Sequence, residues 1–154
     1  MILQTLFCPR DRVMIEGGAY FCMKQDAGSA DPEETCGILF GSRGTGIVQG
    51  SRTLANGAGR DESRRHYRID PLEFHRLEER IENDGFEIIG FWHSHVEKPA
   101  VLSAEDEKNM IPGMIYLIFP VSGGRTGRGR AYEKSASDGT VKEIHIMLKE
   151  SRTS

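Results

Sequence analysis

The fold of this chain is decided by the stretch Phe91-Trp92-His93-Ser94-His95-Val96-Glu97-Lys98-Pro99-Ala100-Val101-Leu102-Ser103-Ala104-Glu105-Asp106. An apolar run enters this stretch, two histidines follow two residues apart, and a Ser-x-x-Asp pair comes after a short loop. Side chains at i and i+2 of an extended segment point to the same face, so His93 and His95 can converge on one point. With the carboxylate of Asp106 they supply three protein ligands and leave one position for water, as catalytic zinc sites do.

A structural interpretation of the same residues stays open at this point. A His-x-His pair is common on its own, and Ser103 and Asp106 would also form a good capping box at the start of a helix. These residues by themselves therefore predict either a metal site or a capped helix.

The length and composition are those of an ordinary soluble globular protein. The 154 residues are most simply a single domain, residues 1–154, large enough to bury a core without disulfides. With 38% hydrophobic and 28% charged residues and a formal net charge of −3, nothing favours nucleic acid or an anionic membrane as a partner. No apolar run approaches the roughly 20 residues that span a bilayer, and the first residues lack the pattern of a signal peptide.

The cysteines indicate the redox environment. Cys8, Cys22 and Cys36 include no Cys-x-x-Cys pair, and an odd number cannot all form disulfides within one chain. We therefore expect a reducing environment and a cytoplasmic location.

The pattern of apolar residues predicts one mixed sheet flanked by helices, an α/β (α+β) fold. Helices are predicted at residues 11–26, 70–82 and 103–110, from apolar periodicity or from a capping signal. The clearest begins at Asp70-Pro71 and has Phe74, Leu77 and Ile81 on its core face. Strands are predicted at residues 36–41, 47–54, 66–69, 86–92, 114–119, 127–132 and 141–148, with a loop at 27–32.

Five other residues that could carry chemistry are expected to have ordinary structural roles. Trp92 points to the strand face opposite His93, so we expect it in the core. Cys36 starts an apolar strand and is expected to be buried packing. The remaining histidines are expected at the surface or on a helix face: His66, His75 and His145.

A pair of glutamates stands before the first predicted strand, in Pro32-Glu33-Glu34-Thr35-Cys36-Gly37-Ile38-Leu39-Phe40-Gly41. A hydrolytic zinc site needs a carboxylate outside the ligand set that takes a proton from water and passes it to the leaving amine. Taken alone, however, an acid at the end of a loop is more simply a solvated charge.

Taken together, the segments of this chain resemble the JAMM metalloprotease domain, the metal-bearing MPN class that is also called Mov34/PAD-1. Order and spacing agree from about residue 12 to residue 132, and the combination of an upstream Glu, His-x-His and Ser-x-x-Asp is far more specific than any one part. The matching segments are Pro-Glu-Glu-Thr-Cys-Gly-Ile-Leu-Phe-Gly at 32–41, Leu54-Ala55-Asn56, Asp70-Pro71, Ile89-Gly90-Phe91-Trp92-His93-Ser94-His95 and Ser103-Ala104-Glu105-Asp106.

This resemblance implies a role for five residues and one Zn²⁺ per chain. His93, His95 and Asp106 match the zinc ligands of the family. Glu34 matches the general acid/base, because the family's glutamate lies two residues before the Cys-Gly step. Ser103 matches the serine that hydrogen-bonds near the metal and helps to stabilise the tetrahedral intermediate. The implied fold is a curved mixed sheet with helices on both sides, related to that of the zinc cytidine deaminases.

Two positions depart from the family pattern. The family usually has proline after the second histidine and before the serine, where this chain has Val96 and Leu102. Both prolines shape the intervening loop, so we expect the departures to affect loop rigidity and substrate fit rather than zinc binding.

The resemblance also implies a substrate class. Family members cut after the C-terminal glycine of ubiquitin-like proteins, and small prokaryotic forms release adducts from a sulfur-carrier protein. The short connections here favour a small, stand-alone prokaryotic peptidase, monomeric or homodimeric, that binds a substrate tail along an exposed strand edge. The alternative is a non-catalytic MPN-type scaffold for a ubiquitin-like partner. A deaminase is disfavoured because the chain has no Pro-Cys-x-x-Cys ligand pair.

Overall fold

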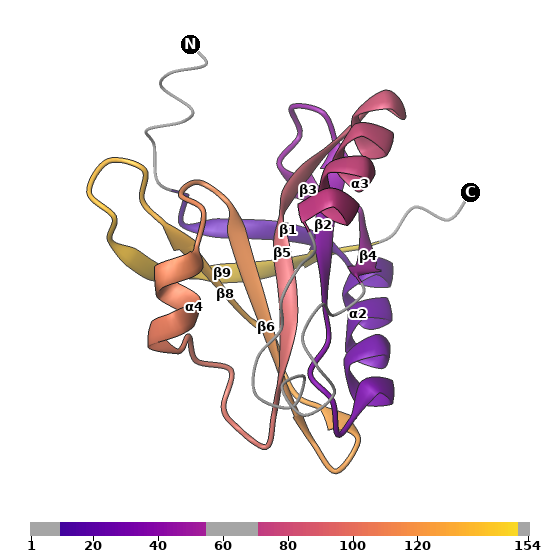
Figure 1. Ribbon diagram of the computed structural model, residues 1–154, viewed down its shortest axis with the longest axis vertical. Coiled ribbons are helices and arrows are strands. Elements are labelled where there is room, and N and C mark those ends of the chain that lie inside the picture. Colours follow the sequence, from indigo (N-terminus) through magenta and orange to yellow (C-terminus); the bar gives the residue numbers. More distant parts are fainter. Residues whose placement is uncertain (1–9, 55–70, 151–154) are drawn as a thin grey trace.

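The computed structural model describes residues 10–54 and 71–150, which form a nine-stranded sheet and the helices that pack against it (Figure 1). None of the helices in these two segments is long and apolar enough to cross a membrane. The helices are α2 (Gly17–Ala30), α3 (Pro71–Asn83) and α4 (Ala104–Asn109). The strands are β1 (Arg12–Glu16), β2 (Cys36–Ser42), β3 (Ile47–Val48), β4 (Gly50–Leu54), β5 (Phe86–Val96), β6 (Ile115–Ser122), β7 (Arg125–Thr126), β8 (Arg130–Lys134) and β9 (Val141–Lys149).

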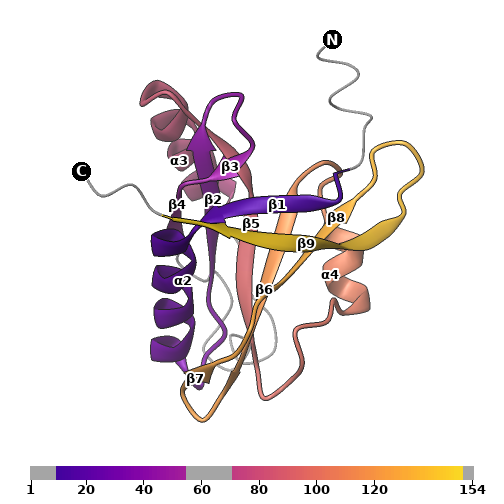
Figure 2. The same cartoon turned by 180° about the vertical axis from the view of Figure 1, so that it is seen from behind.

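The sheet is mixed and strongly curved. Its strand order is β3-β1-β9-β8-β6-β5-β2-β4, with β7 paired to β6. The two ends of this order, β3 and β4, are separated in the chain only by Gln49, so both ends of the sheet are held close together. The side-chain Oε1 of Gln49 accepts hydrogen bonds from the backbone N and the Oγ of Ser42, at 2.6 and 2.7 Å. Figures 1 and 2 show the result, since β1 and β9 cross the direction of β5 at a steep angle. The expected curved mixed sheet is confirmed.

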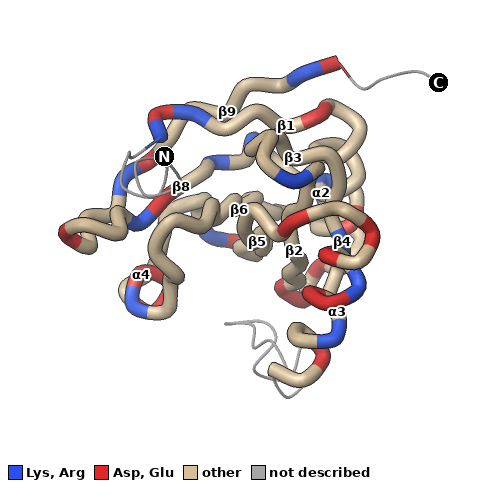
Figure 3. The backbone as a smooth tube through the Cα atoms, turned by 90° about the horizontal axis from the view of Figure 1, so that it is seen from above, with Lys and Arg blue, Asp and Glu red and all other residues tan. Residues whose placement is uncertain are grey.

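The sheet separates two hydrophobic clusters because side chains alternate between its faces. Strand β6 shows this most clearly, since Ile115, Leu117 and Phe119 face one cluster while Tyr116 and Ile118 face the other. Figure 3 shows α2 with β1 and β9 on one side of β6, β5 and β2, and α3 with α4 on the other. The strand predicted at 114–119 is therefore confirmed as β6, and both of its faces are covered.

Trp92 is fully buried, as expected from its position opposite His93. Its ring lies 6.1 Å from that of Phe119, edge to face, in the cluster beside α2. Its neighbours in the chain, Phe91 and His93, point to the other face, toward α3 and α4. The histidine face of β5 is thus the face that those two helices cover.

The predicted helix at residues 11–26 is wrong in its first part. Residues Arg12–Glu16 form β1, which lies parallel to both β3 and β9, and α2 begins only at Gly17. Val13 and Ile15 are buried two residues apart, which is the period of a strand. Pairing with β9, more than a hundred residues away, overrides the helical spacing of the local sequence.

The same helix also ends later than predicted. It continues to Ala30, through part of the segment expected to be a loop, because Ala19, Met23 and Ala27 form its buried stripe at intervals of four. Cys22, in the same helix, is exposed. In the strand predicted at 141–148, Ile144 is buried and Leu148 is 52% exposed.

The other elements agree with the sequence apart from their ends. The strand predicted at 47–54 is divided into β3 and β4, and β5 extends beyond the predicted end at residue 92 to include both site histidines. Helix α3 buries Leu77 and Ile81 as expected. His75 and His145 are exposed. The strand predicted at 66–69, with His66 and the helix cap Asp70, lies outside the described residues.

Gly90 lies where β5 and β6 approach each other closely in the centre of the sheet. A Cβ at this position would collide with the backbone carbonyl of Ile115, which cannot move without separating the two strands. Gly90→Ala should therefore reduce the free energy of unfolding by roughly 1–3 kcal/mol, measured by urea denaturation. The control is Gly17→Ala, where a Cβ meets only the Lys149 carbonyl oxygen at 3.6 Å and stability should change little. Equal urea midpoints for Gly90→Ala and the unmodified chain would contradict this packing.

Candidate active site

Strand β5 brings two histidines to one point. His93 and His95 lie on the same strand face, and their Nε2 atoms are 3.2 Å apart. Both are buried, at 1% and 4% exposure. The Nδ1 of His95 lies 2.9 Å from the carbonyl oxygen of Pro99. A carbonyl can only accept, so this contact places the proton of His95 on Nδ1 and leaves the Nε2 lone pair for a metal.

Helix α4 adds a carboxylate to the same point. The backbone N of Ser103 donates to Oδ2 of Asp106 at 2.9 Å, and the backbone N of Asp106 donates to Oγ of Ser103 at 3.0 Å. This is a complete capping box, and it restrains the Asp106 side chain. Oδ2 of Asp106 lies 3.3 Å from Nε2 of His95 and 3.7 Å from Nε2 of His93. The capping and ligand interpretations of this pair are therefore compatible.

The three side chains fit a tetrahedral metal. Their donor atoms are separated by 3.2, 3.3 and 3.7 Å. Zinc bonds of about 2.0–2.1 Å in tetrahedral geometry require ligand atoms about 3.3 Å apart. Two imidazole nitrogens and one carboxylate oxygen are also a donor set that zinc accepts. Among the described residues, His93, His95 and Asp106 are the group of possible ligands that comes together in this way.

The protonation of the cluster follows from burial and from the contacts within it. Burial lowers the pKa of His93, which favours the neutral imidazole that binds metals. Burial opposes ionisation of Asp106, but the adjacent imidazoles of His93 and His95 outweigh it and hold the pKa of that carboxyl well below its usual range. For His95, burial lowers the pKa, and the contacts with Asp106 and Pro99 more than compensate and raise it.

The antiparallel pairing of β2 with β5 brings Glu34 to this cluster. Cys36 pairs with His93, and just beyond it the backbone N of Ser94 donates to the Thr35 carbonyl and the backbone N of Thr35 donates to the Ser94 Oγ, both at 2.9 Å. Continuing this register puts Glu34 level with His95 and on the same face. Glu34 is only 3% exposed and lies outside the three-residue cluster. Its neighbour Glu33 is exposed. The site thus has a buried carboxylate beside the three possible metal ligands that is not part of their cluster.

Two contacts hold Glu34, and the sequence did not predict either. Its Oε2 accepts a hydrogen bond from the backbone N of Val96 at 3.2 Å and lies 2.9 Å from the Nζ of Lys98. The signal for the first contact was present, because a residue other than proline at position 96 has a backbone N–H to donate. No spacing rule pointed to Lys98, whose direction depends on the loop conformation.

The position of Ser103 leaves its hydroxyl hydrogen available. The Oγ accepts from Asp106 N, a bond that does not use the O–H, and the residue is exposed at the first turn of α4.

Cys36 is a packing residue rather than a nucleophile. It is fully buried beneath α3, and burial, with a smaller contribution from the charge of Glu73, raises the pKa of its thiol to about 12. A thiol with this pKa is not ionised at neutral pH. Cys22 and Cys36 are both free.

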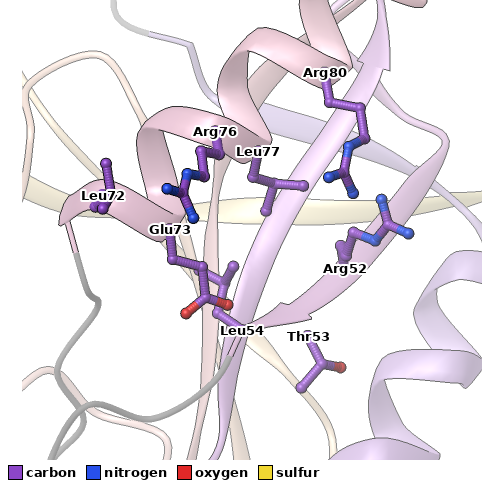
Figure 4. A pocket seen from close by; sticks show the side chains of 8 residues that line it. All are labelled: Arg52, Thr53, Leu54, Leu72, Glu73, Arg76, Leu77 and Arg80. Carbon is purple, nitrogen blue, oxygen red and sulfur yellow. The ribbon is translucent and has the colours of Figure 1, made fainter.

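A basic groove lies between β4 and helix α3 (Figure 4). It has a volume of about 480 Å³, and Arg52 from β4 and Arg76 and Arg80 from α3 extend into it. Leu54, at one end of the groove, pairs with Cys36, which in turn pairs with His93. The groove is therefore two strands away from the histidine cluster.

Comparison with known proteins identifies relatives over most of the chain. A family model described as prokaryotic homologs of the JAB domain matches residues 23–133. A desampylase from Haloferax volcanii is 36% identical over 104 residues, which are 67% of this chain and 73% of the relative. A desampylase from Pyrococcus furiosus is 32% identical over 82 residues, which are 53% of this chain and 55% of that relative.

Solved structures share the same fold. The solution structure of a protein from Desulfitobacterium hafniense has a TM-score of 0.74 and 29% identity, over 90% of this chain and 93% of its own. The crystal structure of a JAB1/MPN domain protein from Archaeoglobus fulgidus has a TM-score of 0.56 over 90% of this chain and 100% of its own, and at 17% identity it bears on the fold alone. The family match and the 36% identical relative show that this chain belongs to the prokaryotic homologs of the JAB domain, a small JAMM/MPN protein.

Proposed function

We propose that this chain is a zinc-dependent peptidase that hydrolyses the amide or isopeptide bond after the C-terminal glycine of a ubiquitin-like or sulfur-carrier protein. The observation that carries the proposal is the buried carboxylate of Glu34 beside, but outside, a three-donor cluster with tetrahedral spacing. The desampylases among the relatives support hydrolysis of a ubiquitin-like conjugate. We also propose a cytoplasmic enzyme, in keeping with the free Cys22 and Cys36.

His93, His95 and Asp106 would hold one Zn²⁺ per chain. When bound, zinc lowers the pKa of water to about 7 and polarises a carbonyl oxygen. The chain's own residues prepare this site, because the Pro99 carbonyl selects the His95 tautomer and the capping box restrains Asp106.

Glu34 acts as the general base and then the general acid. It takes a proton from the attacking water and returns it to the nitrogen of the leaving amine. A carboxylate that is not a ligand keeps the lone pairs that this proton transfer requires. Ser103 donates its hydroxyl hydrogen to the carbonyl oxygen as negative charge develops there, while the same Oγ continues to accept from Asp106 N.

The open side of β4 is the edge along which the substrate tail lies extended. Strand β4 pairs with β2 on one side and, within the described segments, with no strand on the other. An extended tail can pair with such an edge through its main chain. The arginines of the adjoining groove, Arg52, Arg76 and Arg80, favour acidic side chains on the substrate.

Metal analysis distinguishes a zinc peptidase from a non-catalytic scaffold. The purified chain should contain about one zinc per molecule, and His95→Ala should contain far less. Removing zinc with a chelator should abolish cleavage of fusions between ubiquitin-like proteins of the same genome and a reporter, and added zinc should restore it. Mass spectrometry of the products identifies the bond that is cut. A metal-free chain that binds a ubiquitin-like partner without cleaving it would support the scaffold instead.

Glu34→Gln tests the base. The amide keeps the shape of the side chain but cannot accept the proton, so kcat should fall by roughly 10²–10⁴-fold while zinc stays bound. Glu33→Gln, at the exposed neighbour, is the matched control and should keep normal turnover. Near-normal cleavage by Glu34→Gln would remove Glu34 from the mechanism.

Ser103→Ala removes both roles of the hydroxyl, the helix cap and the hydrogen-bond donor to the carbonyl oxygen. Stability reports on the first role and kcat on the second. Losing the cap should cost about 1 kcal/mol of stability, and losing the hydrogen-bond donor should lower kcat by roughly 10²-fold. Ser103→Thr retains a hydroxyl and should keep most of both. If Ser103→Ala lowers the unfolding midpoint and leaves kcat unchanged, Ser103 is only a helix cap.

A further inference from the structure

The loop after the second histidine reaches back to the general base. Two of the residues 96–99, hereafter the site loop, contact Glu34: the backbone N of Val96 at 3.2 Å and the Nζ of Lys98 at 2.9 Å. Both contacts are made to the same oxygen, Oε2. Neither involves Oε1, so the two oxygens of this carboxylate have different surroundings.

Glu97 fixes the site loop to the far end of β6. Its φ of 56° is in the left-handed region, where a residue other than glycine is uncommon. Three hydrogen bonds hold it there: its backbone N donates to the Val121 carbonyl at 2.8 Å, and its carboxylate accepts from Ser122 Oγ at 3.0 Å and from Gly123 N at 3.1 Å. The reversal of the chain at Glu97 places Lys98 next to the residue that Val96 also contacts. The direction of the Lys98 side chain is therefore built into the loop.

We propose that Lys98 is a positioning residue for Glu34, an inference that rests on the proposed function. Together with the Val96 amide, it holds Oε2 and so presents Oε1 as the oxygen that accepts the proton and returns it. Rotation of a carboxylate about its last torsion has no sharp preference, and two donors on one oxygen remove that freedom. Proton transfer requires the accepting oxygen within about 2.6–3.2 Å of the proton donor, so this restraint acts directly on the chemical step.

The buried negative charge of Glu34 also favours a lysine at position 98. Glu34 is 2% exposed at its side chain, and a buried carboxylate without donors is strongly disfavoured. The Lys98 side chain is 40% exposed, so its ammonium remains in contact with water while it compensates the buried charge. Val96 makes the second donor possible, because the proline usual in the family at this position has no N–H.

Lys98→Met and Lys98→Arg test the proposal kinetically in the zinc-loaded enzyme. Lys98→Met should lower kcat about tenfold and leave KM within about twofold, since the base is misplaced but the substrate contacts are kept. Lys98→Arg keeps the charge and should recover most of kcat. The matched control is Lys142→Met: Lys142 is 39% exposed, its Nζ lies 3.1 Å from Oδ1 of Asp11, and it is on β9. This control should behave as the unmodified enzyme.

Two further measurements show whether Lys98 acts through Glu34. In the Glu34→Gln background, Lys98→Met should cause no additional loss of the residual activity. In the metal-free protein with ¹³C-labelled glutamate, the carboxyl signal of Glu34, assigned by its absence in Glu34→Gln, should move in Lys98→Met and stay in place in Lys142→Met.

Each contrary outcome has a definite meaning. Unchanged kcat in Lys98→Met, a change in KM alone, or an additional loss in the Glu34→Gln background would overturn the positioning role. An unmodified enzyme that cleaves none of the fusions would contradict the proposed function, and the carboxyl signal then decides by itself whether Lys98 holds Glu34.

Discussion

The antiparallel register between β2 and β5 is the constraint on which the rest of the site depends. It sets Cys36 opposite His93, and the Thr35–Ser94 hydrogen bonds extend it until Glu34 is level with His95. Because side chains alternate along a strand, a shift of one residue would turn Glu34 to the other face of the sheet. Gly37 contributes to this register, since the Trp92 indole fills the space that a Cβ there would need. The packing of Trp92 against Gly37 and the placing of Glu34 beside His95 therefore depend on the same strand register.

Three independent local features build the candidate site. Strand alternation aligns His93 with His95, a helix cap restrains Asp106, and a reversed loop directs Lys98. Hydrogen bonds within the chain restrain each part: the Pro99 carbonyl orients His95, the Ser103 N–H holds Asp106, and the site loop is held through Glu97. If zinc binds as we propose, a site restrained in this way needs little rearrangement to hold it.

The local sequence predicted those parts of the molecule that local rules govern. The i and i+2 spacing placed His93 and His95 together, and the capping box placed the start of α4. Glu34 could be chosen only through the family resemblance, because a strand register between distant segments leaves no local trace. For the same reason β1 was mistaken for helix, since its burial depends on β9. The contact of Lys98 with Glu34 was not predicted, because the direction of the Lys98 side chain depends on the positive φ of Glu97, which no local sequence pattern indicates.

The position of β1 in the sheet has a consequence for synthesis of the chain. It lies between β3 and β9, and Arg12 contacts Met147, 135 positions further along. The ribosome therefore releases the first described strand long before the strand that completes its pairing exists. Until β9 emerges, β1 has β3 as its neighbour in the described sheet but lacks its second partner, while β5 already has both of its neighbours, β2 and β6. The part of the sheet that carries the histidines can therefore form first, and closure around β1 waits for β9.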